Sequence, residues 1–306
     1  MMTSTVQQQT MVVPQLPTLD ASEFRWHPSP ADSSIMQRKA NGIEAWVGIK
    51  DPNANGAYDF YQDIVLRVRD ISGLSLSRFK RALMISLLEA RFENPSISCY
   101  GVWGQNKNPY IPHIQYKSFE DDTEAQVWAS DIITALPTTK ICEELRAERN
   151  KKRRSLKVRE HANSLDVFIV ADVDSEDAIL APGAKIEIMC LFNHLIWDGK
   201  GRYFAGQLVQ RASKILDSGK ENTMPSYLWG EEMTNLDPPV LDVLEVGLDS
   251  LGPGYDVIHK KLLDSQLRVR VRIHDLSNPC SLNRPTLISV PVKLGPFSLQ
   301  DLRRPS

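Results

Sequence analysis

The chain has 306 residues, of which 42% are hydrophobic and 24% are charged, as in ordinary soluble globular proteins. Its formal net charge of −2 gives no overall attraction to nucleic acid or to anionic membranes, and no stretch approaches the roughly 18 apolar residues of a membrane span. The four cysteines lie far apart with no CxxC pair, which disfavours structural zinc and a disulfide framework. We therefore expect a cytoplasmic protein with reduced thiols that binds no metal, no nucleic acid and no membrane.

The chain divides into three predicted regions. Residues 1–22 are polar and contain proline, without a basic segment followed by a long apolar run, so we expect a disordered tail and no signal peptide. Residues 23–220 carry regular hydrophobic patterns and are expected to form an N-terminal domain. Residues 221–306 are rich in proline and glycine and are interpreted as a crossover linker followed by an incomplete C-terminal segment.

The first ordered elements are a strand and a long helix. Alternation in "DIVLRVRD", residues 63–70, predicts the strand. "SLSRFKRALMISLLEARFE" predicts a helix that Ser75 or Ser77 can cap and that ends at Asn94-Pro95. Its apolar face is expected to hold Phe79, Leu83, Leu87 and Ala90.

Two further strands, one helix and a basic stretch follow. "ISCYGVW" and "YIPHIQYKSF" predict strands joined by a loop over 104–109. "DTEAQVWASDIITALP" predicts a helix with Trp128, Ile132 and Leu136 on one stripe and Pro137 at its end. The basic stretch over 146–159 is interpreted as a solvated loop or helix end, with a phosphate-binding patch as the alternative.

A predicted hairpin then leads to the most informative part of the chain. "SLDVFIVADVD" and "AKIEIMCLFN" read as its two strands, and a helix follows with Phe204, Leu208, Ala212 and Ile215 at helical spacing. Near the end, "LRVRVRIHD" predicts one strand with Arg268, Arg270 and Arg272 on a cationic face. Strands and helices are thus mixed, which predicts an α/β sandwich over the N-terminal two-thirds.

The stretch "LFNHLIWDGKG" places His194 at the predicted strand end, Asp198 four residues later, and Gly199 next. A lone histidine there is more often a packing residue, so the pattern alone leaves packing and catalysis open. The strand-to-helix junction favours a cleft-facing site, since Gly199 and Gly201 allow a sharp turn and leave space for a ligand. The chain has no phosphate loop, no G-x-S-x-G elbow and no second histidine at metal-ligand spacing.

"NHLIWDGKG" resembles the HxxxDG motif of the acyltransferase superfamily that includes chloramphenicol acetyltransferase, plant BAHD acyltransferases and condensation domains of peptide synthetases. The residues of this motif and the downstream segment "YLWGEEMTNLDPPVLDVL" are similar to those of the fungal trichothecene 15-O-acetyltransferase branch. The resemblance implies a chloramphenicol acetyltransferase-like α/β fold, a two-layer sandwich of mixed sheet and helices whose second domain is incomplete here.

The resemblance also implies a function and roles for three residues. His194 would be the general base that takes a proton from a substrate hydroxyl as it attacks an acyl thioester, a task that suits imidazole near neutral pH. Asp198 would support the loop structurally by pairing with an arginine, and Gly199 would let the substrate approach closely. The implied reaction is O-acetylation of a secondary metabolite, in mycotoxin biosynthesis, with acetyl-CoA or another acyl-CoA as co-substrate and no bound cofactor.

The chain also departs from the family. Two-domain members are longer and carry a second motif, DFGWG, which this sequence lacks. Three interpretations follow: a truncated product, a homo-oligomer that assembles its site between subunits, or a repurposed homologue that binds a metabolite or partner without acyl transfer. In the homo-oligomer, the face of Arg268, Arg270 and Arg272 could meet coenzyme A phosphates, although an exposed edge strand explains it more simply.

Overall fold

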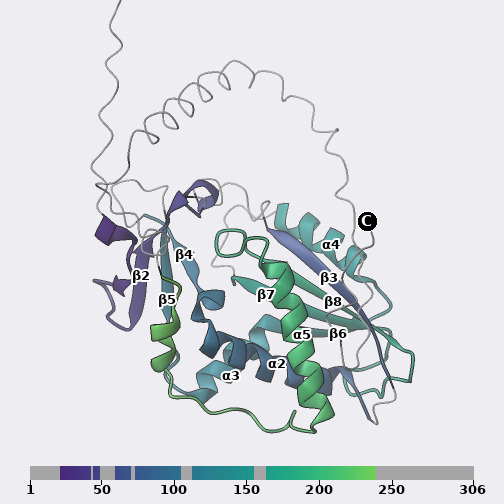
Figure 1. The fold of residues 1–306 in the computed structure, drawn as a ribbon. Helices are drawn as coiled ribbons and strands as arrows, with labels where there is room; N and C mark the ends of the chain where they lie inside the picture. The colour runs from purple at the N-terminus through teal and green to yellow at the C-terminus, as the bar shows by residue number, and fades with distance from the viewer. Residues whose placement is uncertain are drawn as a thin grey trace, which may run out of the picture.

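The computed structural model describes residues 21–42, 44–48, 59–69, 73–104, 112–154 and 163–238. Its strands form two four-stranded sheets (Figure 1). Sheet A is antiparallel in the order β1-β2-β5-β4, with β1 His27–Pro28, β2 Ile35–Lys39, β4 Tyr100–Val102 and β5 His113–Lys117. Sheet B has the order β3-β8-β7-β6, with β3 Phe60–Arg67, β6 Ile133–Pro137, β7 Leu165–Ala171 and β8 Lys185–Phe192.

Sheet B contains the predicted hairpin and the first predicted strand. β8 lies between β3 and β7 and pairs antiparallel with both, whereas β6 pairs parallel with β7. Alternate residues of β8, Ile186, Ile188, Cys190 and Phe192, are at most 1% exposed and belong to one core cluster. The mixed α/β fold expected from the sequence is therefore confirmed, and its most buried strand is the one that leads into the histidine motif.

The long helix α2, Leu76–Glu93, forms where the sequence predicts it. The backbone N–H of Arg78 donates to Ser75 Oγ at 3.3 Å, so Ser75 and not Ser77 is the cap. Phe79, Leu83 and Leu87 are at most 1% exposed, as the apolar stripe predicts. Asn94 ends the helix because the following Pro95 disfavours helical geometry at the residue before it.

The helix predicted over 122–137 is wrong in its second half. Helix α3, Asp122–Ile132, is capped by Asp121, and the chain continues as strand β6. The β-branched run Ile132-Ile133-Thr134 favours extended backbone, and the parallel pairing with β7 satisfies the backbone groups of β6. Leu136 consequently packs with a cluster on the opposite face of sheet B. Pro137 is tolerated because it ends an edge strand.

The basic stretch begins in a helix that covers the outer face of sheet B. Helix α4, Cys142–Arg154, packs Cys142 and Leu145 against this face. Arg149 Nη2 donates to Asp166 Oδ2 at 2.6 Å, and Arg146 lies 3.7 Å from Asp63 Oδ2. The basic stretch is thus a helix end over residues 146–154, one of the two forms that the sequence predicts, and Arg146 and Arg149 attach α4 to the sheet. Residues 155–159 of the stretch lie outside the described residues.

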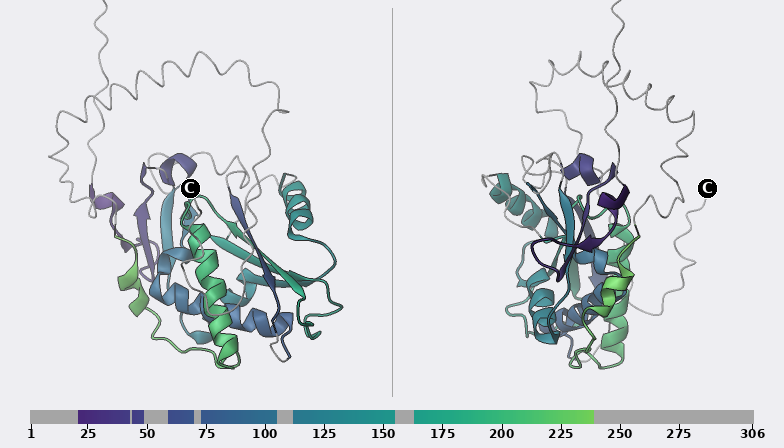
Figure 2. Two further views of the ribbon diagram at one scale, coloured as in Figure 1. Left: turned by 45° about the vertical axis from the view of Figure 1, so that its right-hand side comes forward. Right: turned by 90° about the vertical axis from the view of Figure 1, so that its left-hand side faces the viewer.

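Helix α5, Gly201–Asp217, lies on the inner face of sheet B together with α2. Leu208, Ala212 and Leu216 are buried there, whereas the predicted stripe residues Phe204 and Ile215 are partly buried at its margin. The right-hand view of Figure 2 shows α4 and α5 on opposite sides of the strands. Sheet B is thus covered by helices on both faces.

Residues 218–238, which follow α5, pack back across α2 and α3. Tyr227 stacks on Phe92 with ring centroids 4.5 Å apart, and Trp229 Nε1 donates to Asp122 Oδ1 at 2.7 Å. Glu232, in the short helix η3 Glu231–Asn235, is fully buried and accepts a hydrogen bond from Tyr116 Oη at 2.6 Å. The domain boundary predicted between residues 220 and 221 stays a prediction. The residues that follow it, up to 238, pack against the N-terminal fold.

Three short helical segments are also present: η1 Ala21–Phe24, residues 44–48, and η2 Pro95–Ser98. Within the described ranges, no helix is both long and apolar enough to cross a membrane. The same ranges contain no group of three or more His, Cys, Asp or Glu side chains that could hold a metal ion. Almost all of the predicted disordered tail lies outside these ranges, and so does the predicted arginine-faced strand over 267–275.

Candidate active site

His194 lies where the sequence predicts it, just beyond the end of sheet B. Strand β8 ends at Phe192, and residues 193–200, here called the motif loop, connect it to α5. His194 is partly exposed, whereas its neighbours Asn193 and Leu195 are buried. The imidazole is therefore presented by a well-packed loop and is not enclosed in the core.

The ring of His194 rests edge-on against Phe60. Their centroids are 5.5 Å apart at an interplanar angle of 76°, and Phe60 itself stacks on Phe192 at 5.0 Å. Among the described residues, His194 Nδ1 is buried and has no hydrogen-bond partner. Of the two ring nitrogens, Nδ1 is therefore shielded from solvent by the surrounding protein.

The motif loop is anchored in two separate hydrophobic cores. Leu195 is 1% exposed and packs with sheet A residues such as Ile114 and Tyr116. Trp197 is 8% exposed and contacts Phe192 in the core between sheet B and α5. Leu195 thus packs in the core of sheet A, and Trp197 packs in the core between sheet B and α5. These two buried side chains hold the loop directly after His194. The expectation that Trp197 is a core residue is confirmed.

The loop begins and ends with turns closed by side-chain acceptors. The N–H of Leu195 donates to Asn193 Oδ1 at 2.9 Å, and the N–H of Lys200 donates to Asp198 Oδ1 at 2.7 Å. The Asp198 carbonyl also accepts from the N–H of Gly201 at 3.1 Å, at the start of α5. Such Asx turns fix local backbone geometry without regular structure. Asp198 therefore holds the end of the loop through a local turn.

No arginine lies within ion-pair distance of Asp198 among the residues that the structure describes. The carboxylate is exposed, so it can also meet a partner outside this part of the chain. The arginine pairing stays a prediction.

The two glycines of the motif region differ in their surroundings. A Cβ on Gly199 would meet no atom of the described residues within 4 Å, so this position has open space beside it in this part of the chain. A Cβ on Gly201 would lie 3.0 Å from Phe60 Cζ and 3.2 Å from Phe192 Cδ1. Gly201 is therefore needed for packing of α5 against Phe60, and the prediction that it leaves space for a ligand is wrong.

Replacement of Gly101 by alanine is expected to disturb the motif loop from sheet A. A Cβ there would overlap Leu195 Cδ2 and would lie 3.0 Å from the ring of Trp103, and the Leu195 side chain is only 1% exposed. Overpacking of this kind costs about 1–3 kcal/mol. We expect a lower midpoint of thermal unfolding for Gly101→Ala by circular dichroism.

The matched control is Gly206→Ala in α5, where an added Cβ meets nothing within 4 Å and alanine favours the helix. Its midpoint should equal or exceed that of the wild type. A Gly101→Ala midpoint as high as that of the control would contradict the tight contact between Gly101 and Leu195.

The described cysteines are buried thiols. Cys99, Cys142 and Cys190 are at most 2% exposed and unpaired, and Cys99 lies just before β4 and not within it. Burial raises the pKa of Cys99 and of Cys190 to about 12 and raises that of Cys142 as well. Because the thiolate is the nucleophile, these three cysteines do not compete with His194 as reactive groups near neutral pH.

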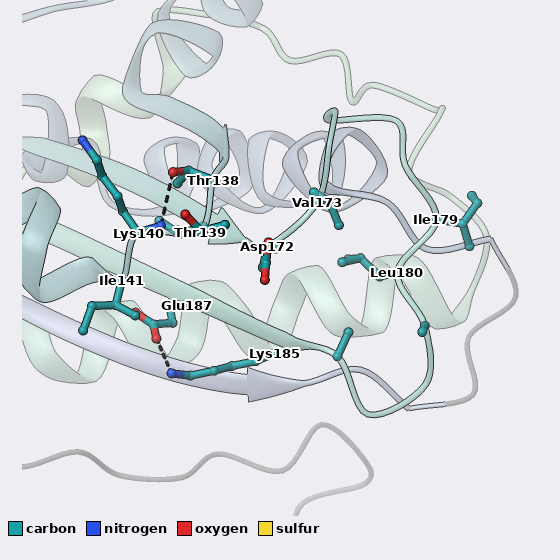
Figure 3. A pocket seen from close by; sticks show the side chains of 14 residues that line it. Thr138, Thr139, Lys140, Ile141, Asp172, Val173, Ile179, Leu180, Lys185 and Glu187 are labelled. Atoms are coloured by element: carbon teal, nitrogen blue, oxygen red, sulfur yellow. Dashed lines mark hydrogen bonds and ion pairs between the residues drawn. The ribbon is translucent and has the colours of Figure 1, made fainter.

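A cavity of about 540 Å³ lies at the far end of β8 from the motif loop (Figure 3). Its lining includes Lys140, Lys185 and Glu187, and the first residue of β8 is Lys185. Lys185 pairs with Glu187, and Lys140 pairs with Glu148 at 2.8 Å. At about 3.3 Å per residue, eight strand residues separate this cavity from the motif loop by roughly 20 Å or more. It therefore takes no part in chemistry at His194.

Two residues of the site escaped the sequence analysis. Phe60 begins β3, more than 130 positions before His194, and no local pattern indicates that the two rings meet. Asn193 does carry a local signal, because asparagine directly after an apolar strand is a preferred turn former.

A partly exposed histidine at the end of a central strand, followed by an aspartate-glycine pair at the start of a helix, is the arrangement that the resemblance to HxxxDG acyltransferases implies. The model of one protein family, described as 15-O-acetyltransferase Tri3, matches residues 16–273. The chain belongs to this family.

The comparisons with individual proteins agree. The chain is 59% identical over 257 residues to SAT12 of Stachybotrys chartarum, covering 84% of this chain and 45% of SAT12. It is 32% identical over 246 residues to the trichothecene 15-O-acetyltransferase TRI3 of Fusarium sporotrichioides, covering 79% of this chain and 46% of TRI3. The solved structure of that enzyme superposes with a TM-score of 0.75 at 30% identity, over 84% of this chain and 50% of the enzyme. The chain thus spans about half the length of the relatives it matches.

Proposed function

We propose that this chain is an O-acetyltransferase that moves an acetyl group from acetyl-CoA to a hydroxyl of a trichothecene-type metabolite. The observation that carries the proposal is the placement of His194, partly exposed on a doubly anchored loop, in a chain of the Tri3 family. The acceptor follows from the Fusarium relative, which is named for acetylation at the 15-hydroxyl of trichothecenes.

In this proposal, His194 Nε2 accepts the proton of the acceptor hydroxyl as its oxygen attacks the thioester carbonyl. Collapse of the tetrahedral intermediate forms the ester and expels the thiolate of coenzyme A, which takes up the proton. Asp198 holds the end of the motif loop through its turn with Lys200 and does not touch the reacting atoms. Gly199 faces open space beside this loop and gives the substrate room to approach. Positioned proton transfer contributes a factor of about 10² to 10⁴ in rate.

The test is incubation of the 306-residue chain with acetyl-CoA and a trichothecene that carries a free 15-hydroxyl, followed by measurement of free thiol. The control acceptor is a trichothecene that lacks the 15-hydroxyl or in which this hydroxyl is already acetylated. Thiol release that requires the free hydroxyl supports the proposal. No release above the acceptor-free rate with any hydroxylated trichothecene would overturn it, and acetyl-CoA binding without transfer would favour the repurposed homologue.

Replacement of Gly199 by alanine is expected to raise the KM for the acceptor by about tenfold or more, since one misplaced methyl group in a substrate site costs roughly 1–3 kcal/mol. The stability of the fold should not change, because the added Cβ meets no atom of the described residues within 4 Å. Steady-state kinetics and thermal unfolding of the same preparation separate the two effects. An unchanged KM would remove Gly199 from the substrate site.

A further inference from the structure

We infer that Asn193 is a positioning residue for His194, and that its side-chain carbonyl sets the backbone geometry from which the imidazole projects. The inference rests on the proposed function for its effect on activity, and on the geometry of the motif loop for its physical basis. Asn193 is 7% exposed and directly precedes His194.

The backbone of Asn193 is fixed by the neighbouring strand. Its N–H donates to the carbonyl of Ser164 at 2.9 Å, one position beyond the pairing of Phe192 with Leu165. Sheet B thus continues by one hydrogen bond past its last paired residues. Asn193 is consequently the last residue whose position the sheet determines, and His194 is the first whose position the loop determines.

Three hydrogen bonds then close the loop onto Asn193. Its side-chain Oδ1 accepts from the N–H of Leu195 at 2.9 Å, and its main-chain carbonyl accepts from the N–H of Ile196 at 3.1 Å and of Trp197 at 2.9 Å. The three residues that follow His194 therefore all donate to one residue that precedes it. His194 lies inside the ring that the side-chain bond closes, so its φ and ψ angles depend on that bond.

The side-chain bond has no evident substitute. The N–H of Leu195 lies in a buried segment, and the Leu195 side chain is enclosed in the sheet A core. Water cannot readily replace a lost acceptor there, so loss of Oδ1 leaves a buried N–H unpaired or forces the turn to change. Without that bond the backbone at His194 is less constrained, and a shift of about 1 Å at a catalytic group can cost 10²-fold in rate.

The experiment compares Asn193→Ala with Asn193→Asp, which keeps an oxygen at the Oδ1 position, and Asn193→Ser, whose hydroxyl closes the same turn more weakly. The control is Asn235→Ala, an amide on the surface that donates to the Phe92 carbonyl, far along the chain from the motif loop. We expect kcat of Asn193→Ala to fall by about 10- to 100-fold with little change in KM for acetyl-CoA. Asn193→Asp should recover most of that loss, Asn193→Ser part of it, and Asn235→Ala should match the wild type.

A second readout does not require activity. The imidazole signals of His194, assigned by comparison with His194→Gln, should move in the NMR spectrum of Asn193→Ala and return towards the wild-type position in the aspartate and serine variants. If the wild type transfers no acetyl group, the proposed function fails while this spectrum still tests the inference. If Asn193→Ala does not fold, the serine variant takes its place. Wild-type His194 signals together with wild-type kcat in the variant lacking Oδ1 would overturn the inference, as would equal losses in the alanine and aspartate variants.

Discussion

Replacement of Trp197 by alanine is expected to lower the free energy of unfolding by about 3–5 kcal/mol, the usual cost of removing a large buried aromatic side chain. Trp197 is 8% exposed and lies between Phe192 and Phe204, with ring centroids 5.0 Å and 4.8 Å away. The cavity would open beneath the motif loop, so one of its two anchors would be lost. Urea unfolding followed by circular dichroism measures the change.

Two matched variants make this prediction specific. Trp197→Phe should cost much less, because a ring remains and the indole Nε1, buried without a partner among the described residues, gives up no hydrogen bond. Leu228→Ala removes a side chain that is 71% exposed and should change the free energy by less than about 0.5 kcal/mol. A cost for Trp197→Ala as small as that for Leu228→Ala would show that the motif loop is not anchored in the core of sheet B.

Replacement of His194 by alanine is expected to reduce acetyl transfer by about 10² to 10⁴, the usual contribution of a positioned general base. The side chain is partly exposed and no hydrogen bond to it is found among the described residues, so its loss should leave folding almost unchanged. His194→Gln keeps a polar side chain of similar reach but cannot accept the proton, and should be as impaired as the alanine variant. Initial rates of thiol release measure both.

His27 provides the control for this prediction. It lies in β1 of sheet A and interacts through Nδ1 with the carbonyl of Arg25 at 2.9 Å, away from the motif loop. His27→Ala should retain the wild-type rate. If His194→Gln also retained that rate, the proton would be accepted elsewhere and the role assigned to His194 would be wrong.

The sequence predicts the elements around His194 well because their signals are local. Alternating apolar residues in β3 and β8, the helical stripe in α2, and the Asn94-Pro95 stop each depend on near neighbours in the chain. The segment 133–137 shows where such reasoning fails. Its apolar spacing continues that of α3, but parallel pairing with β7, more than thirty residues later, makes it a strand. A tertiary partner overrides local periodicity there.

The candidate site divides in the same way. The positions of His194 and Asp198 follow from the strand end and the helix start, and both could be predicted. The contacts that hold the site could not be predicted, because they join segments that are far apart in the sequence. Phe60 packs against the His194 ring, and Gly101 lies against Leu195. The aromatic contacts of residues 218–238 with α2 and α3 could not be predicted either, because the composition of this segment is typical of a linker. The homo-oligomer, one of the three interpretations of the missing second motif, and the implied arginine partner of Asp198 are not tested by these contacts.

The most direct measurement uses acetyl-CoA that carries an isotope label in its acetyl group. The chain and its His194→Ala variant are each incubated with this donor and a trichothecene that has a free 15-hydroxyl, and the recovered acceptor is analysed by mass spectrometry. The account predicts labelled ester at that hydroxyl with the wild type and a strong reduction with the variant. Equal labelling by both proteins, or none by either, would contradict it.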